Sequence, residues 1–351
     1  MRPWGDLPGD DPSRDRKAAE AELEAAGIDL HPTPPGRLAP HEPHGLPGHA
    51  HPHEHSEAGE PPIIGIVGAG AVGTALGVAL SRAGWPIHAV ASRDAGRRER
   101  FRSMVEVGRA FIDPEPLVEE VELIILAVPD DIVAALAATL RMYSGQAMIH
   151  TSGALGAEVL APAMAAGTQV GSFHPLVAFA DTERAVAALH GATVAIEADD
   201  QLATMLAAMA EAIGATPVRL APGTKPAYHA AAVLAAGGFV ALLDAIVELG
   251  RVAGLDEAGS LAIYGPLIEG TLGNARALGV AAALTGPITR GDLGTLRSHL
   301  QALRTHAPRA LELYVAAARR EIALAEDRGA LAPEVAGTMR ATLDGPVARP
   351  D

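Results

Sequence analysis

Short apolar runs alternate with longer amphipathic stretches between residue 61 and about residue 220. Apolar runs of strand length, rich in branched side chains and bounded by Gly, Pro or Asp, are typical of buried strands. The pattern predicts strands at 63–67, 87–91, 123–128, 146–150, 169–173 and 193–197, and helices at 74–82, 132–142 and 201–213. Strands that alternate with helices indicate an α/β fold, a doubly wound parallel sheet with helices on both faces.

The strand pattern stops after Pro222-Gly223, and only helical periodicity follows. It predicts helices at 225–253, 257–278, 293–303 and 308–328, and therefore an all-α C-terminal domain. The uncharged run 226–243 contains polar residues and a glycine pair, so we expect a buried helix there and not a membrane span. From residue 331 to residue 351 the periodicity is weak, and we expect a frayed end.

The first 60 residues have a different composition, with ten Pro, seven His and a charge of −7. Such a segment cannot bury a core, so we expect a disordered tail. Its cluster His49, His51, His53 and His55 is either a weak site for a divalent metal or a solvated polar tract. The expected organisation is a tail at 1–60, a nucleotide-binding domain at 61–220, a helical substrate and dimerisation domain at 221–330, and a frayed end at 331–351.

The amino-acid composition and the net charge exclude several classes of function. The chain has 351 residues, 49% of them hydrophobic, which is enough for two domains with sizeable cores. It has no cysteine, which excludes disulfides and thiolate metal sites and fits a cytoplasmic protein. The net charge of −15 argues against a nucleic-acid partner, and no signal peptide is visible. The expected partners are a small-molecule substrate and a second copy in a homodimer, with no nucleic acid and no membrane.

A glycine-rich turn directly follows the first predicted strand. Gly68, Gly70 and Gly73 form a G-x-G-x-x-G pattern that includes Ala71 and Val72 and opens a helix. In that context the first glycine permits a tight turn, the second admits a pyrophosphate and the third allows close helix–strand packing. The turn therefore predicts a dinucleotide site.

The tip of the second predicted strand reads Ser92-Arg93-Asp94. An acid at this tip favours the ribose hydroxyls of NAD, whereas a hydroxyl and a guanidinium suit the 2′-phosphate of NADP. We therefore expect NADP, while a shift of register would make Asp94 the ribose acid. Ala127, Val128 and Pro129, at the end of the next strand, are expected beneath the cofactor.

Two polar clusters follow predicted strands, His150-Thr-Ser-Gly153 and Ser172-Phe-His-Pro175. Ligands of open parallel sheets bind beyond the carboxyl ends of the strands, so Ser152 and His174 are candidates for holding a substrate oxygen. The alternative for each is a loop residue that bonds only to its neighbours.

Lysine and asparagine are scarce: 25 of the 27 basic residues are arginine, Lys17 and Lys225 are the only lysines, and Asn274 is the only asparagine. Lys225 begins the first helix of the second domain, and His229 follows on the same helix face. Carbonyl reduction needs a proton for the developing alkoxide, which a lysine ammonium can donate or stabilise. We expect Lys225 in that role, with His229 and Asn274 positioning the substrate; the alternative is an exposed lysine at a helix start.

A polar break, Leu284-Thr-Gly-Pro-Ile-Thr-Arg-Gly-Asp292, separates two predicted helices. We expect it to form a wall of the substrate crevice, because a polar loop is costly to bury without a purpose. Arg290 and Asp292 are expected to pair with each other.

Together these motifs, including Lys225-Pro-Ala-Tyr-His229-Ala-Ala, resemble bacterial proteins that join a Rossmann-like domain to domain of unknown function 2520. The resemblance runs from about residue 63 to about residue 326. Its architecture is similar to that of pyrroline-5-carboxylate reductase, ketopantoate reductase and the 6-phosphogluconate dehydrogenase group. The resemblance implies an NADP-dependent oxidoreductase with an all-helical, often dimer-forming second domain.

The chain departs from this family at one point. The family usually has a Ser-Asn pair about thirteen residues after the lysine, where this chain has Gly237-Gly238. Either Asn274 takes over the role or the activity is weakened. The favoured function is an NADPH-dependent reductase of a small carboxylate-bearing 2-oxo or imino compound. The alternatives are a non-catalytic NADP-binding sensor or scaffold, and a metal-handling protein that works through its histidine tail.

Overall fold

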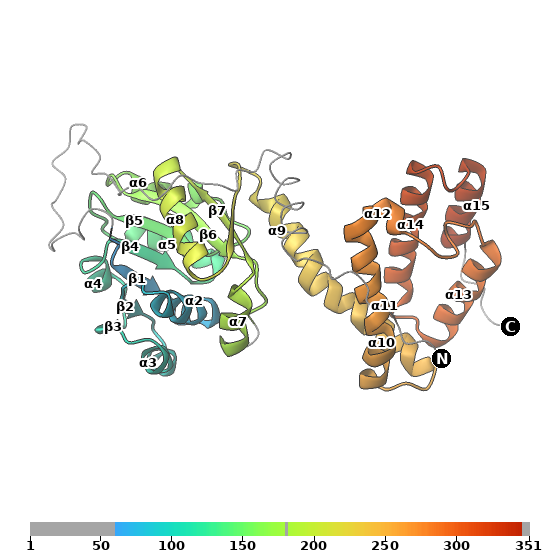
Figure 1. The fold of residues 1–351 in the computed structure, drawn as a ribbon, viewed down its shortest axis with the longest axis horizontal. Coiled ribbons are helices and arrows are strands. Elements are labelled where there is room, and N and C mark those ends of the chain that lie inside the picture. Colours follow the sequence, from blue (N-terminus) through green and yellow to red (C-terminus); the bar gives the residue numbers. More distant parts are fainter. Residues whose placement is uncertain (1–59, 180–181, 346–351) are drawn as a thin grey trace, which may run out of the picture. The chain divides into compact units, whose positions relative to one another are not determined.

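The computed structural model describes residues 60–179 and 182–345, so almost all of the predicted tail, with its histidine cluster, lies outside the described residues. The chain divides into two compact units, Met1–Ala232 and Val233–Asp351 (Figure 1). Each is described by itself below. The division falls twelve residues after the predicted domain boundary at residue 220.

An eight-stranded sheet forms the centre of the first unit. Its order is β3-β2-β1-β4-β5-β6-β7-β8, in which every neighbouring pair is parallel except β6 and β7. The strands are β1 (Ile64–Val67), β2 (Ile87–Ala91), β3 (Arg109–Phe111), β4 (Leu123–Leu126), β5 (Ala147–His150), β6 (Gln169–Pro175), β7 (Thr193–Ala198) and β8 (Thr216–Arg219). The order reverses direction at β1, as in a doubly wound sheet, which confirms the predicted fold class.

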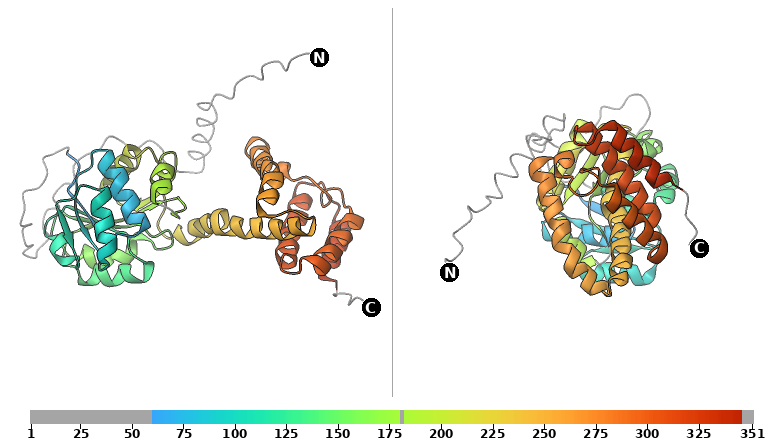
Figure 2. Two further views of the ribbon diagram at one scale, coloured as in Figure 1. Left: turned by 90° about the horizontal axis from the view of Figure 1, so that it is seen from below. Right: turned by 90° about the vertical axis from the view of Figure 1, so that its right-hand side faces the viewer.

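Helices cover both faces of this sheet (Figure 2). The larger core places Ile66, Ile125 and Ile149 against α2 (Ala71–Arg82), α3 (Ala95–Met104), α7 (Thr182–Leu189) and α8 (Asp200–Ala212). The other core places Leu126 and Met148 against α4 (Glu115–Val118), α5 (Asp130–Thr139), η1 (Ala157–Leu160) and α6 (Ala161–Met164). Strands buried on both faces are continuously apolar, and that property is what made most of them predictable.

Two strands were not predicted, and both lie at edges of the sheet. β3 has three residues and is largely exposed, so it carries no apolar run. β8 contains Pro217, which interrupts a strand pattern and is tolerated at an edge, where one side of the backbone needs no partner.

The second unit is helical. It contains α10 (Phe239–Val252), α11 (Glu257–Leu278), α12 (Val280–Ala283), α13 (Leu293–His306), α14 (Leu311–Asp327) and α15 (Pro333–Asp344). Its main core brings together Leu296, Leu300 and Ile322. The all-α prediction for this part of the chain is confirmed.

The prediction of a frayed end from residue 331 is wrong for the residues that the structure describes. α15 begins at Pro333, whose fixed φ suits a first helical turn. It buries Ala336, Met339 and Leu343, a single narrow stripe against the core of α13 and α14. Three buried positions in twelve residues are too few to stand out as a period in the sequence.

A long apolar helix starts at α9 (Lys225–Val233), passes through a π-helical segment (Leu234–Gly238) and continues as α10. The mean hydropathy of its most apolar 18 residues is 2.2, and by length and composition alone the helix is long enough to cross a membrane, a property shared by core helices of soluble proteins. Only 6% of its most apolar stretch is buried in the chain, so the prediction of a buried helix is wrong for the single chain.

Candidate active site

The turn between β1 and α2 has the geometry expected of a dinucleotide cradle. Gly68 has φ +109°, and a Cβ there would lie 2.2 Å from the carbonyl oxygen of Ala127. A Cβ at Gly73 would lie 2.0 Å from the carbonyl oxygen of Gly68, so only glycine lets α2 pack this closely on the strand. No atom lies within 4 Å of the Cβ position at Gly70, which leaves the space that a pyrophosphate needs.

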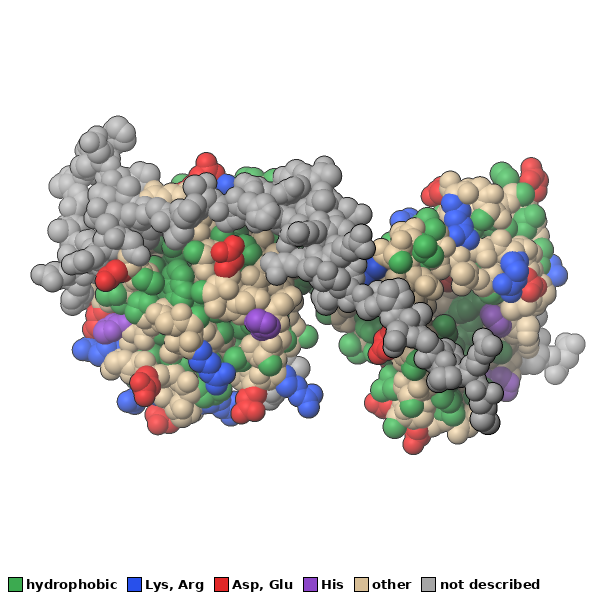
Figure 3. Space-filling model, in the orientation of Figure 1, with side chains coloured by type: hydrophobic (Ala, Val, Ile, Leu, Met, Phe, Trp, Pro, Cys, Tyr) green, Lys and Arg blue, Asp and Glu red, His purple; other side chains and the backbone are tan. Residues whose placement is uncertain are grey.

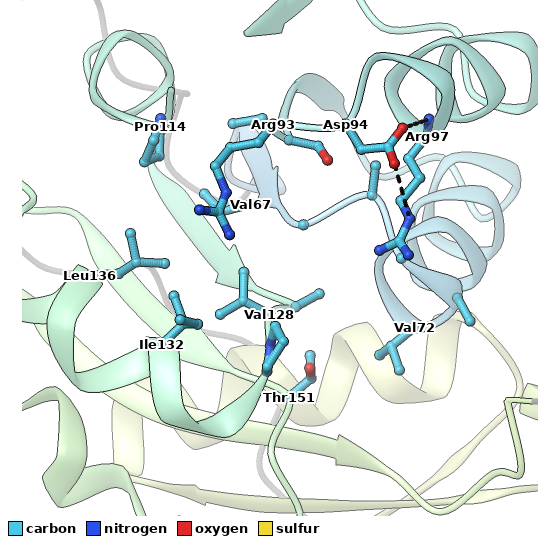
Figure 4. Close-up of a pocket in the computed structure, with 18 of the residues that line it drawn as sticks. Val67, Val72, Arg93, Asp94, Arg97, Pro114, Val128, Ile132, Leu136 and Thr151 are labelled. Carbon is cyan, nitrogen blue, oxygen red and sulfur yellow. Dashed lines mark hydrogen bonds and ion pairs between the residues drawn. The ribbon is translucent and has the colours of Figure 1, made fainter. Parts of the chain in front are cut away.

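This turn opens into a cavity of ≈ 840 Å³ (Figure 4). The free N–H groups at the start of α2 face it, and a helix N-terminus favours an anion. Of the predicted cofactor residues, Gly68, Gly70, Ala71, Val72, Ser92, Arg93, Ala127, Val128 and Pro129 line the cavity. Gly73 is absent from the lining and lies one turn inside α2. The residues present therefore fit a dinucleotide.

Two arginines face this cavity beyond the tip of β2, and one of them was not predicted. The guanidinium groups of Arg93 and Arg97 both point toward the interior in Figure 4. Asp94 caps α3, because its Oδ1 accepts a hydrogen bond of 2.9 Å from the Arg97 N–H. That bond lowers the pKa of the Asp94 carboxyl. Asp94 also lines the cavity, and its Oδ2 lies 3.8 Å from the Arg97 Nε.

A short loop, residues 151–156, connects β5 to η1 and begins at the cavity wall with Thr151. His150 holds both ends of the loop: its Nδ1 accepts from the Ser152 N–H at 3.2 Å, and its Nε2 donates to the Gly156 carbonyl at 3.1 Å. This arrangement requires neutral imidazole, and burial lowers the pKa of His150 to about 4. The Ser152 hydroxyl oxygen accepts from the N–H groups of Ala154 and Leu155.

Lys225 is buried beneath this loop and does not line the cavity. Its side chain is 0% exposed, and its Nζ donates a hydrogen bond of 2.6 Å to the Ser152 carbonyl. Burial lowers the pKa of the ammonium to about 8, while the Glu197 carboxylate acts in the opposite direction. The structure thus places Lys225 beside Ser152, another predicted site residue. The contact is made to the main-chain carbonyl of Ser152 and not to its hydroxyl.

His174, Tyr228 and His229 form a cluster of rings next to the loop. The His174 ring lies edge-on to the other two, at 5.8 Å from Tyr228 and 5.7 Å from His229. The Nδ1 atoms of both histidines and the hydroxyl of Tyr228 are buried without a partner among the described residues. Burial, followed by the charge of Lys225, lowers the pKa of His174 to about 4.

Gly153 makes this cluster possible. A Cβ at residue 153 would lie 2.3 Å from His229 Nδ1 and 2.8 Å from His174 Nε2. The first unit therefore brings together four predicted site residues, namely Ser152, His174, Lys225 and His229. No group of three or more histidine or acidic side chains in the part of the chain that the structure describes has the geometry of a metal site.

The remaining candidates lie on the second unit. Asn274 is exposed on α11. Asp292 caps α13, accepting from the Thr295 N–H at 2.9 Å and the Thr295 hydroxyl at 2.7 Å. In the described residues no ion pair joins it to Arg290, so the expected pairing is replaced by a helix cap. Gly237 and Gly238 end the π-helical segment.

Comparison with known protein families identifies both halves of the chain. Residues 50–175 match the Rossmann-like domain, and residues 192–321 match the domain of unknown function DUF2520. None of the curated proteins matches the sequence.

Several solved structures share the fold. A protein from Thermotoga maritima is 25% identical, with a TM-score of 0.59 over 76% of this chain and 99% of its own. A candidate NADP oxidoreductase from Bacteroides fragilis is 24% identical, with a TM-score of 0.59 over 74% of this chain and 98% of its own. A 1-pyrroline-5-carboxylate reductase from Streptococcus pyogenes is 15% identical, with a TM-score of 0.52 over 81% of this chain and 97% of its own.

Proposed function

We propose, from the premise that this chain belongs to the proteins that join a Rossmann-like domain to a DUF2520 domain, that it is an NADPH-dependent oxidoreductase. Its substrate would be a small carboxylate-bearing 2-oxo or imino compound, which it reduces. The observation that carries the proposal is the glycine-turn cavity, with two guanidinium groups facing it beyond the tip of β2. The fold shared with an NADP oxidoreductase candidate supports the same reading.

Arg93 and Arg97 are the basis of the preference for NADPH over NADH. A guanidinium binds a phosphate through paired hydrogen bonds and remains charged at every physiological pH. The Ser92 hydroxyl also lines the cavity at this point, whereas the nearby carboxylate of Asp94 is engaged with the Arg97 main chain. These groups would hold the 2′-phosphate.

Bound NADPH would supply the hydride, so the chain itself must bind the acceptor and stabilise the charge that develops on it. The ring cluster of His174, Tyr228 and His229 is suited to this task, since it holds polar atoms without a partner in the described residues. The two histidines lie next to Gly153, which follows the cavity-lining Thr151 by two residues. We assign Lys225 the role of charge stabiliser from beneath the loop. The hydrogen bond to the Ser152 carbonyl uses one of the three N–H groups of the ammonium.

Ser152 and Asn274 have different parts in this proposal. The Ser152 hydroxyl shapes the loop by accepting two main-chain hydrogen bonds, and its proton stays available to a substrate oxygen. Asn274 remains a proposed positioning residue on the second unit. The name of the Streptococcus pyogenes neighbour, a reductase of a pyrroline carboxylate, supports a cyclic imine or 2-oxo acid as the substrate class.

The test is NADPH oxidation, followed by absorbance, over a panel of 2-oxo acids and carboxylate-bearing cyclic imines. NADPH binding is measured separately by its fluorescence. Turnover of at least one compound is the expected result. Binding without turnover of any compound would instead favour a non-catalytic NADP sensor, and absence of binding would overturn both.

We also infer a homodimer in the cytoplasm. Twelve of the sixteen large hydrophobic side chains exposed in the described residues lie between Val233 and Val280. They belong mainly to α10 and α11, which contact each other, and hydrophobic side chains are visible on the surface of this unit in Figure 3. Monomeric proteins rarely expose so much apolar surface in one region, so a second copy is the proposed cover.

A further inference from the structure

The glycine-turn cavity is bounded by segments that follow neighbouring strands of the sheet. From β3 to β6 every neighbouring pair is parallel, so the carboxyl ends of these strands lie along one edge. The glycine turn follows β1, near the middle of this row. On one side the lining comes from residues 92–97 after β2 and 112–114 after β3, and on the other from residues 127–136 after β4, Thr151 after β5 and Phe179 after β6. A dinucleotide bound across the turn would therefore reach both sides.

The two sides of this cavity differ in charge. Among the described residues that line it, the charged side chains all follow β2 or β3, namely Arg93, Asp94, Arg97 and Asp113. Beyond β4, β5 and β6 the lining side chains are apolar except for Thr151, whose hydroxyl donates to the Leu126 carbonyl at 3.4 Å. The 2′-phosphate needs the guanidinium side, so the uncharged reduced nicotinamide ring would fall on the apolar side.

Phe179 supplies an aromatic ring at this apolar end. It is the single aromatic side chain among the described lining residues. The ring packs against the larger core of the first unit, as do Val72 and Ala127, which line the same cavity. Phe179 is half-buried, so the core supports it while part of it stays accessible. An aromatic ring fixed in this way offers a firm apolar surface on which another flat ring can stack.

We propose that Phe179 is a cofactor-binding residue, which covers one face of the nicotinamide ring at the apolar end of the glycine-turn cavity. The inference rests on the proposed binding of NADPH and does not depend on which compound is reduced. A covered face is shielded from water, and the acceptor would then bind at the opposite face. The G-x-G-x-x-G pattern gives no indication of this residue, because Phe179 follows a distant strand of the sheet.

The test compares two ligands that share one end. NADPH carries the 2′-phosphate and the nicotinamide, whereas 2′,5′-ADP carries the 2′-phosphate and lacks the nicotinamide. Both affinities are measured by calorimetry on the full chain, without any substrate. In Phe179→Ala we expect NADPH to bind about fivefold to fiftyfold more weakly, while the affinity for 2′,5′-ADP changes by less than about twofold.

Ile112→Ala is the matched control. Ile112 lines the same cavity on the β3 side and is 59% exposed, so its replacement removes apolar surface at the end that both ligands share. It should weaken NADPH and 2′,5′-ADP by the same factor.

An unchanged NADPH affinity in Phe179→Ala, or equal losses for the two ligands, would overturn the inference. If that variant fails to fold, Phe179→Leu keeps an apolar side chain without the ring, and it should lose at least about threefold in NADPH affinity with 2′,5′-ADP unaffected. Equal losses there would overturn the inference as well. A wild-type protein that binds NADPH and turns over no compound contradicts the reductase activity alone, whereas one that does not bind NADPH overturns both proposals.

Discussion

Arg97 is the single side chain whose charge we expect to matter most for the choice of cofactor. Replacing it in Arg97→Gln removes a guanidinium from the cavity while the Asp94 cap is retained, because that bond uses the main chain. NADPH affinity should fall about tenfold to a hundredfold, and NADH affinity should change by less than about twofold. Fluorescence titration with both nucleotides measures this difference.

Arg102→Gln is the matched control on the same helix. Arg102 is exposed and lies 3.7 Å from Glu99, outside the lining of the cavity. Its replacement should leave both affinities unchanged. Equal losses for NADPH and NADH in Arg97→Gln would contradict recognition of a 2′-phosphate by this residue.

Position 153 needs a glycine because two imidazole rings pack against it and leave no room for a Cβ. Its backbone conformation does not itself require glycine. The added methyl in Gly153→Ala meets His229 and His174 well inside van der Waals contact, so the rings must move. We expect a loss of about 1–3 kcal/mol in the free energy of unfolding and shifted imidazole NMR signals. Gly337→Ala is the control: nothing lies within 4 Å of its Cβ position on an exposed helix, and stability should rise slightly. Wild-type stability and unmoved rings in Gly153→Ala would contradict this account.

At the residue scale, most of the predicted cofactor residues line the glycine-turn cavity, because G-x-G-x-x-G has a backbone meaning that does not depend on tertiary packing. Arg97 was missed since it lies one helical turn beyond the strand tip, where no periodic signal marks it. The burial of Lys225 could not be predicted, because its hydrogen-bond partner Ser152 is distant in sequence. Scarcity singled out this lysine but did not indicate where its ammonium lies.

Two buried histidines, His150 on β5 and His174 on β6, should make the stability of the first unit fall in acid. The pKa values of His150 and His174 are lowered to about 4 by burial, so the unfolded chain binds protons between about pH 6.5 and pH 4 that the folded chain does not. The free energy of unfolding should therefore decrease by about 2–4 kcal/mol from pH 7 to pH 5. Lys225, with a pKa lowered to about 8, has the same sign at higher pH, so stability rises above about pH 8.

Urea unfolding at several pH values measures this slope. His150→Asn removes one of the two groups and should reduce the slope by about half, at some cost in overall stability. His306→Gln, at an exposed position near the end of α13, should leave the slope as it is. Stability that stays constant between neutral and mildly acid pH would contradict the burial of neutral imidazoles.

At the element scale, the strands and helices that bury the most apolar residues are the ones that could be predicted from the sequence. Strands buried on both faces, such as β1 and β4, carry four consecutive buried apolar residues and were found within two residues of their bounds. The edge strands β3 and β8 and the narrow stripe of α15 were not found, because each contributes too few core residues to form a pattern. The long apolar helix was found, but a sequence cannot tell burial within one chain from burial between two.

The whole molecule should be a dimer, with a mass of about twice 35.9 kDa in sedimentation and light scattering. Leu267 and Leu272 on α11 are 68% and 52% exposed, and glutamate at both should raise the dissociation constant by at least about tenfold. Met164→Glu is the control, since it places the same charge on a side chain that is equally exposed but belongs to the first unit. A wild-type protein that sediments as a monomer at every concentration would overturn the dimer.

The burial of Lys225 has a practical consequence for chemical labelling of amines. Within the described residues the chain presents no accessible amine, because this one is 0% exposed. An acylating reagent should therefore react with residue 225 only during rare openings of the loop above it. The rate of modification at residue 225, measured by mass spectrometry, would then report how often this loop opens. The protein thus contains a natural probe of local unfolding at the edge of the glycine-turn cavity.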